Sequence, residues 1–152
     1  MIPSKHITHW RQYAPWIFQS QVEQDLVLSR ALVLLFQQPV IQETLAFRGG
    51  TALNKLYCDS LARYSEDIDL VQIRDEPIGE VMGAIRDAID PWLEKASWKQ
   101  TARSVKFIYR FNSEDIPFFD AVVLFVDDYP RLASGEIEGF LDPVVIVLSE
   151  LL

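Results

Sequence analysis

Cysteine, histidine and basic residues are scarce in this 152-residue chain, and each shortage excludes a class of site or partner. The single cysteine, Cys58, cannot form an internal disulfide, and the two histidines are too few for a cysteine–histidine zinc cluster. Against 22 Asp and Glu residues stand 14 Lys and Arg residues, and the formal net charge is -8. This balance argues against a protein that holds nucleic acid through a broad basic surface, so a polyanionic ligand needs a local basic site.

Long apolar runs are also missing. The apolar stretch 26–36 is interrupted by Ser29 and Arg30 and is shorter than the about 20 residues that cross a bilayer. Residues 1–20 lack the apolar core of a signal peptide. These absences and the lone cysteine predict a cytoplasmic protein with no membrane partner.

The composition is that of one globular domain. Hydrophobic residues make up 49% of the chain and aromatic residues 12%, which is enough for a sizeable core, while the length allows only one. The aromatic cluster of the first 18 residues is expected to anchor this segment to the core, with base stacking as the alternative; it comprises Trp10, Tyr13, Trp16 and Phe18. Cys58 is expected to be a small core residue.

Apolar residues at helical spacing predict a helix over residues 20–38, stopped by Pro39. The same spacing leaves Glu23, Asp25 and Arg30 for solvent. This helix belongs to the N-terminal part of the chain, before the first strand-like run.

A strand, a glycine turn and a helix follow. Residues 45–48 form a short strand-like run that stops at Gly49 and Gly50, and the hydroxyl of Thr51 is placed to cap the next helix. Backbone N–H groups at such a turn can approach a phosphate closely, and a helix N-terminus favours anions. An ordinary tight turn is the alternative interpretation.

The rest of the pattern predicts a sheet with a further helix. Residues 68–73 form a strand, and an apolar stripe predicts a helix that begins at 75–77 and ends or bends at Pro91. Alternation over 104–111, a turn and the apolar run 118–126 predict a hairpin whose second strand is central.

Two acidic residues give the strongest chemical signal. Asp67 and Asp69 occupy positions i and i+2 of a strand, so their carboxylates project from the same face, about 7 Å apart along the backbone. Two ionised carboxylates in this position favour a divalent cation with oxygen ligands, such as Mg²⁺. Solvated acids at an exposed strand end are the alternative.

A third acid, Asp120, lies in the apolar run 118–126. Simple alternation places it on the same face as Phe118, Val122 and Leu124. A charge buried there is costly unless it is paired or bound to a metal.

The run 47–55 (FRGGTALNK), followed by 63–70 (RYSEDIDL), resembles the signature of the AbiEii/AbiGii-type nucleotidyltransferase toxins. These are toxins of type IV toxin-antitoxin systems in the DNA polymerase β-like nucleotidyltransferase superfamily. The resemblance implies an α/β (α+β) nucleotidyltransferase fold, with a mixed sheet flanked by helices. It divides the chain into an N-terminal helical segment (1–44) packed on a nucleotidyltransferase core (45–152) that lacks the helical second half of the family.

The resemblance also implies roles for the matching residues. The catalytic acids and ligands of two Mg²⁺ ions would be Asp67, Asp69 and Asp120. The nucleotide contacts would be Gly49, Gly50, Thr51, Lys55, Arg63 and Ser65. For Lys55 and Arg63, the alternative is that they pair with Asp67 and Glu66 and only support the acids.

The activity implied by the resemblance is Mg²⁺-dependent transfer of a nucleotidyl group from an NTP to an acceptor hydroxyl. The expected acceptor is RNA, with tRNA 3′ ends as first candidate and a protein hydroxyl as second. The chain would be the toxin of a toxin-antitoxin or phage-defence pair, with a cognate antitoxin as partner. The alternative is a noncatalytic binding or assembly module of the same fold, or an inactive fragment of such an enzyme.

Two further expectations concern surfaces. The apolar tail 144–152 indicates either an oligomer or docking of missing sequence. A local basic surface for RNA would draw on Arg48, Lys55, Arg63, Lys95, Lys99, Arg103, Lys106 and Arg110.

Overall fold

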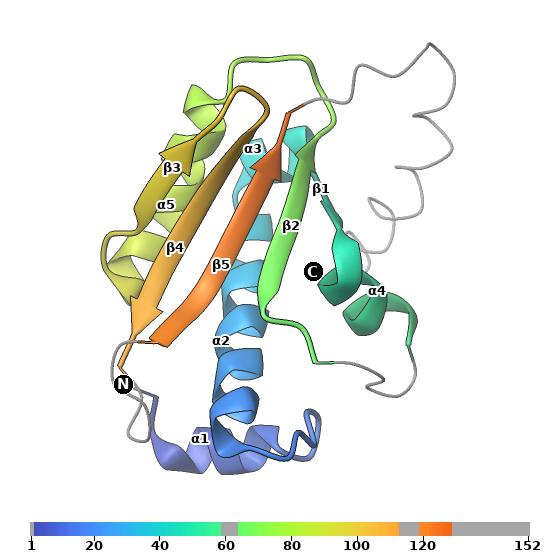
Figure 1. Ribbon diagram of the computed structural model, residues 1–152, viewed down its shortest axis with the longest axis vertical. Helices are drawn as coiled ribbons and strands as arrows, with labels where there is room; N and C mark the ends of the chain where they lie inside the picture. Colours follow the sequence, from blue (N-terminus) through green and yellow to red (C-terminus); the bar gives the residue numbers. More distant parts are fainter. Residues whose placement is uncertain (1, 59–63, 113–118, 129–152) are drawn as a thin grey trace.

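A computed structural model of the protein describes residues 2–58, 64–112 and 119–128, without the side chains of 119–121. Its five strands form one mixed sheet in the order β1-β2-β5-β4-β3 (Figure 1). The helices are α1 (Ser4–Trp10), α2 (Gln19–Phe36), α3 (Pro39–Thr44), α4 (Gly49–Tyr57) and α5 (Gly79–Leu93). The strands are β1 (Leu45–Arg48), β2 (Asp67–Gln72), β3 (Ser97–Gln100), β4 (Ser104–Phe111) and β5 (Phe119–Asp127).

One face of the sheet is covered by α2, α3 and α5, which lie behind it in Figure 1. Alternate strand residues point into this layer and are buried, among them Leu70 of β2, Phe107 of β4 and Leu124 of β5. Helix α4 lies at the β1–β2 side of the sheet, and no described helix covers the opposite face over β3, β4 and β5 (Figure 1). We call this opposite side the open face.

Strand pairing determines which residues share the open face. Strand β2 is antiparallel to β1 and parallel to β5, while β4 is antiparallel to both β5 and β3. Asp69 therefore lies between Arg48 of β1 and Phe125 of β5. Because the positions of β2 alternate, Asp67 shares this face with Asp69.

The sequence predicted most elements and the fold class correctly. The helix expected over 20–38 is α2, the 104–111 and 118–126 runs form the antiparallel pair β4–β5, and β5 is central as expected. Pro39, expected only to stop a helix, opens α3, because a proline at the first helical position loses no hydrogen bond. The helix expected to end or bend at Pro91 continues to Leu93.

Three burial predictions are wrong. Glu23 and Asp25 were expected to face solvent but are only 2% and 5% exposed, because the N-terminal segment packs over this side of α2. Cys58, expected in the core, is exposed just after α4. In the described part of the chain, no helix is both long enough and apolar enough to cross a membrane.

Candidate active site

A glycine turn places the start of α4 directly against Asp69. Gly49 has φ +81°, a left-handed conformation that suits glycine, and a Cβ at this position would overlap the Asp69 carboxylate. Among the described residues, no side chain caps the N-terminus of α4. Its first N–H groups carry positive partial charge and lie at the acid-bearing end of β2, an arrangement that attracts anions.

Thr51 holds this turn in place. Its buried hydroxyl donates to the carbonyl oxygen of Asp67 and is hydrogen-bonded to the hydroxyl of Ser65. The expectation that Thr51 caps α4 is wrong, because the hydroxyl bonds across to β2 and not within its own helix. Its contacts in this structure position the turn relative to the acids.

Asp67 and Asp69 are both half-buried on the open face. Burial raises the pKa of Asp69 above its ordinary value, and repulsion from the Asp67 carboxylate raises it further, while the Arg48 guanidinium lowers it. The site thus holds two carboxylates that repel one another. A cation between them would relieve this repulsion.

Arg48 and Asp127 form an ion pair that sequence reasoning missed. Arg48 ends β1 opposite Asp69, and its guanidinium donates to the carboxylate of Asp127 at the end of β5. Alternation along β5 from Phe125, the partner of Asp69, places Asp127 on the open face and could have revealed it.

Lys55 points away from the acids. Its ammonium group lies 3.2 Å from both carboxylate oxygens of Asp25 and donates to the hydroxyl of Ser29 at 2.9 Å. Asp25 also accepts from the indole N–H groups of Trp10, at 2.8 Å, and Trp16, at 3.4 Å. In this structure Lys55 joins α4 to α2 and to the N-terminal segment, and contacts neither Asp67 nor Glu66. The aromatic cluster anchors that segment in part through these two indoles.

Two predicted site residues lie wholly or partly outside the part of the chain that the structure describes. Arg63 lies outside the described residues, and so does the side chain of Asp120. The backbone pairing of β5 is described, and a register shift pairs Asp120 with Arg110, next to the pair Tyr109–Val122. Because of this shift, the register no longer places Asp120 on the same buried face of the sheet as Val122, where simple alternation placed it.

No group of three or more Asp, Glu, His and Cys side chains within the described ranges could hold a metal ion. The donor set present is the pair Asp67 and Asp69. Two carboxylates on one strand face, with a raised pKa at Asp69, fit a hard divalent cation better than a soft one.

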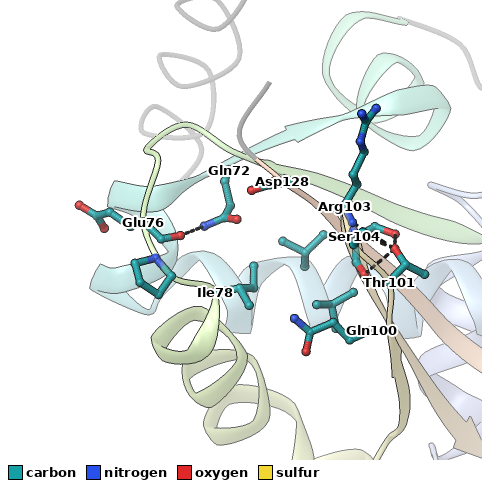
Figure 2. A pocket seen from close by; sticks show the side chains of 12 residues that line it. Gln72, Glu76, Ile78, Gln100, Thr101, Arg103, Ser104 and Asp128 are labelled. Carbon is teal, nitrogen blue, oxygen red and sulfur yellow. Dashed lines mark hydrogen bonds between the residues drawn. The ribbon is translucent and has the colours of Figure 1, made fainter. Parts of the chain in front are cut away.

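A separate pocket of about 170 Å³ lies at the carboxyl end of β2. Figure 2 shows its lining, in which the side-chain amide of Gln72 donates to the carbonyl oxygen of Glu76 at 2.9 Å, and Thr101 and Ser104 form a hydrogen-bonded turn. None of the predicted site residues lines this pocket.

The family model of the AbiEii nucleotidyl transferase toxin, type IV toxin-antitoxin system, matches residues 30–138. The chain belongs to this family. The matched range includes the glycine turn, both acids of β2 and Asp120. A search of the curated proteins found no match.

Solved structures support the fold assignment. The chain is similar to JHP933 from Helicobacter pylori, with 23% identity and a TM-score of 0.52 over 81% of this chain and 49% of that one. It is also similar to MenT4, a nucleotidyltransferase toxin from Mycobacterium tuberculosis, with 19% identity and a TM-score of 0.52 over 86% of this chain and 44% of that one. At these identities the likeness shows the fold, and the AbiEii-type chain spans about half the length of these structures.

Proposed function

We propose that this AbiEii-family chain transfers a nucleotidyl group from an NTP to an acceptor hydroxyl. The observation that carries the proposal is the contact between the glycine turn at Gly49 and the Asp69 carboxylate, on the sheet face that also carries Asp67. The turn suits a triphosphate because its N–H groups are uncapped, and the acids suit the cation that an NTP brings.

The arrangement assigns a role to each group. The N–H groups at Gly49 and Gly50 hold the terminal phosphates, and Thr51 keeps the turn fixed against β2. The acceptor hydroxyl attacks the α-phosphorus, the bond from this phosphorus to the bridging oxygen breaks, and pyrophosphate leaves with the bonding electrons. The proton of the hydroxyl passes to a carboxylate of the site, a role we assign to Asp120.

Asp67 and Asp69 would hold Mg²⁺, with Asp120 as a third ligand. When bound, the metal supplies positive charge that offsets the repulsion between the acids and the phosphates. Without it, a triphosphate would meet two carboxylates, and burial together with their mutual repulsion already raises the pKa of Asp69. We therefore expect nucleotide binding to require a divalent cation.

We further propose RNA as the acceptor, with tRNA 3′ ends tested first, and a cognate antitoxin as the regulatory partner. Both proposals rest on membership of a type IV toxin-antitoxin family. The net charge of -8 requires that an RNA acceptor meet a local basic surface and not the protein as a whole.

Calorimetry of the four NTPs, with and without Mg²⁺, tests the proposal on the wild type and on Asp67→Asn and Asp69→Asn. The matched control is Asp87→Asn, an exposed acid of α5 far from β2 in sequence. Binding that needs Mg²⁺, disappears in both β2 variants and persists in the control supports the proposal, and transfer of a radiolabelled nucleotide to tRNA then tests the acceptor. Absence of Mg²⁺-dependent binding in the wild type would instead favour a noncatalytic module.

A further inference from the structure

Five residues line up across the open face, one from each strand. The strand registers pair Lys99 of β3 with Lys106 of β4, Lys106 with Phe125 of β5, Phe125 with Asp69 of β2, and Asp69 with Arg48 of β1. Neighbouring strands lie about 4.8 Å apart, so Phe125 is one strand spacing from a catalytic acid. Lys99, Lys106 and Phe125, which we call the basic-aromatic row, lie on the side of Asp69 opposite Arg48.

This inference rests on the proposed function. The chemistry of that reaction assigns a role to the side of β2 on which Phe125 lies. In nucleotidyl transfer the attacking and leaving oxygens lie roughly in line through phosphorus. The pyrophosphate would leave toward the glycine turn, which follows β1 on one side of β2. The acceptor hydroxyl must therefore approach from the other side of β2, where β5 presents Phe125.

The basic-aromatic row carries groups that bind single-stranded nucleic acid. The ammonium group of Lys106 lies 5.0 Å from the centre of the Phe125 ring, and Lys99 is exposed beside it. Within residues 2–58, 64–112 and 119–128, neither lysine forms a salt bridge with an acid. Two cations that have no acidic partner in the described part of the chain, beside an aromatic ring, match one base and two neighbouring phosphates of a nucleic-acid strand.

Because the protein is acidic overall, the two lysines of this row form a local basic site. With a net charge of -8, the protein as a whole repels a polyanion, so two lysines in the same row as Asp69 offer a local attractive site. Arg48, the other cation of this line, is bound to Asp127 and lies on the leaving-group side.

We propose that Lys99, Lys106 and Phe125 form the acceptor-strand site, in which Phe125 stacks on the base of the terminal nucleotide of a single-stranded RNA. The two lysines hold its phosphates. The terminal hydroxyl then faces Asp69 from the side opposite the glycine turn.

The test measures binding of a fluorescent single-stranded RNA, about 8 nucleotides long, by anisotropy, and Mg²⁺–NTP binding by calorimetry, on the same preparations. The variants are Lys106→Met, Phe125→Leu and Phe125→Tyr. Lys5→Met of α1 and Phe18→Leu are matched controls, since both residues are exposed and lie outside the sheet. Circular dichroism checks that each variant is folded.

We expect Phe125→Leu to weaken RNA binding roughly tenfold and Phe125→Tyr to retain it, because tyrosine still stacks. Lys106→Met should lower the slope of log affinity against log salt by about 0.7, the value for one phosphate contact. Mg²⁺–NTP binding should stay unchanged in all three variants.

RNA affinity that is unchanged in Phe125→Leu, or that is reduced equally in Phe18→Leu, would refute the proposed acceptor-strand site. Loss of NTP binding with RNA binding retained also overturns it, because the ring would then hold the incoming base. A wild type that binds RNA through this row but no Mg²⁺–NTP refutes the proposed function and leaves the row an RNA site only.

Discussion

The buried carboxylate of Asp25 offers a sharp test of what joins the N-terminal segment, α2 and α4. Its side chain is only 6% exposed and accepts hydrogen bonds from Trp10, Trp16 and Lys55. Asp25→Ala leaves these three donors without their shared acceptor. We therefore expect the variant to be strongly destabilised.

The magnitude follows from the geometry of the pair. Removing one partner of a buried ion pair costs about 3–5 kcal/mol, because the other charge stays buried. The Lys55 side chain is 19% exposed and keeps its hydrogen bond to Ser29 at 2.9 Å. Because this partial exposure and this hydrogen bond reduce the free-energy cost of removing Asp25, we expect the low end of the range, about 3 kcal/mol.

Equilibrium unfolding in urea, followed by tryptophan fluorescence and circular dichroism, measures the change. With a denaturant slope of about 1–3 kcal/mol per molar, the midpoint should fall by about 1–3 M. The control Asp87→Ala removes an exposed acid of α5 and should change stability by no more than about 0.5 kcal/mol.

A change in Asp25→Ala as small as that in Asp87→Ala would refute the reasoning. A second check is the double variant Asp25→Ala/Lys55→Met, which should cost less than the sum of its two single changes. Strict additivity would mean that the ion pair contributes nothing to the junction.

Further changes test the turn, the acids and the core. Gly49→Ala should weaken Mg²⁺–NTP binding and cost at least about 1–2 kcal/mol in urea unfolding, from the left-handed backbone and the overlap with Asp69, whereas Gly83→Ala, in open space on α5, should stabilise by about 0.5–1 kcal/mol. Because the pKa of Asp69 is raised, its ionisation destabilises the fold as pH rises, so in EDTA Asp69→Asn should gain stability over wild type as the pH rises above about 4, the ordinary pKa of an aspartate. Burial, then the hydrogen bond to Asp90, raises the pKa of Tyr109, so stability should fall above about pH 10, and less steeply in Tyr109→Phe.

The sequence predicted the elements whose local signals agree with their packing. The strand 45–48 ends at a diglycine turn, and 104–111 alternates between buried and less buried residues, so both were found with their bounds. Strand β3 was missed because all four of its residues are exposed, which leaves no alternation to read. It is held at the sheet edge by pairing with β4, which no local pattern reports.

From the sequence we could name candidate site residues, but not the residues that each of them contacts. The pair Asp67 and Asp69 and the glycine turn are brought together as expected. The partners of Lys55 and Thr51 could not be read from spacing, because Asp25 lies 30 positions before Lys55 and the register shift near Asp120 depends on β4. Long-range pairing decides such contacts, and a one-residue shift changes the face of every position beyond it.

The position of β5 in the sheet also governs how the protein must be assembled during synthesis. The hairpin-like units β1–β2 and β3–β4 do not pair with each other; β5 lies between them, and Asp67 pairs with Val123. A nascent chain emerging from the ribosome therefore carries the glycine turn and both acids well before the strand that completes their frame exists. An incomplete product ending before β5 would carry the signature of the family without the sheet that frames the glycine turn and the two acids.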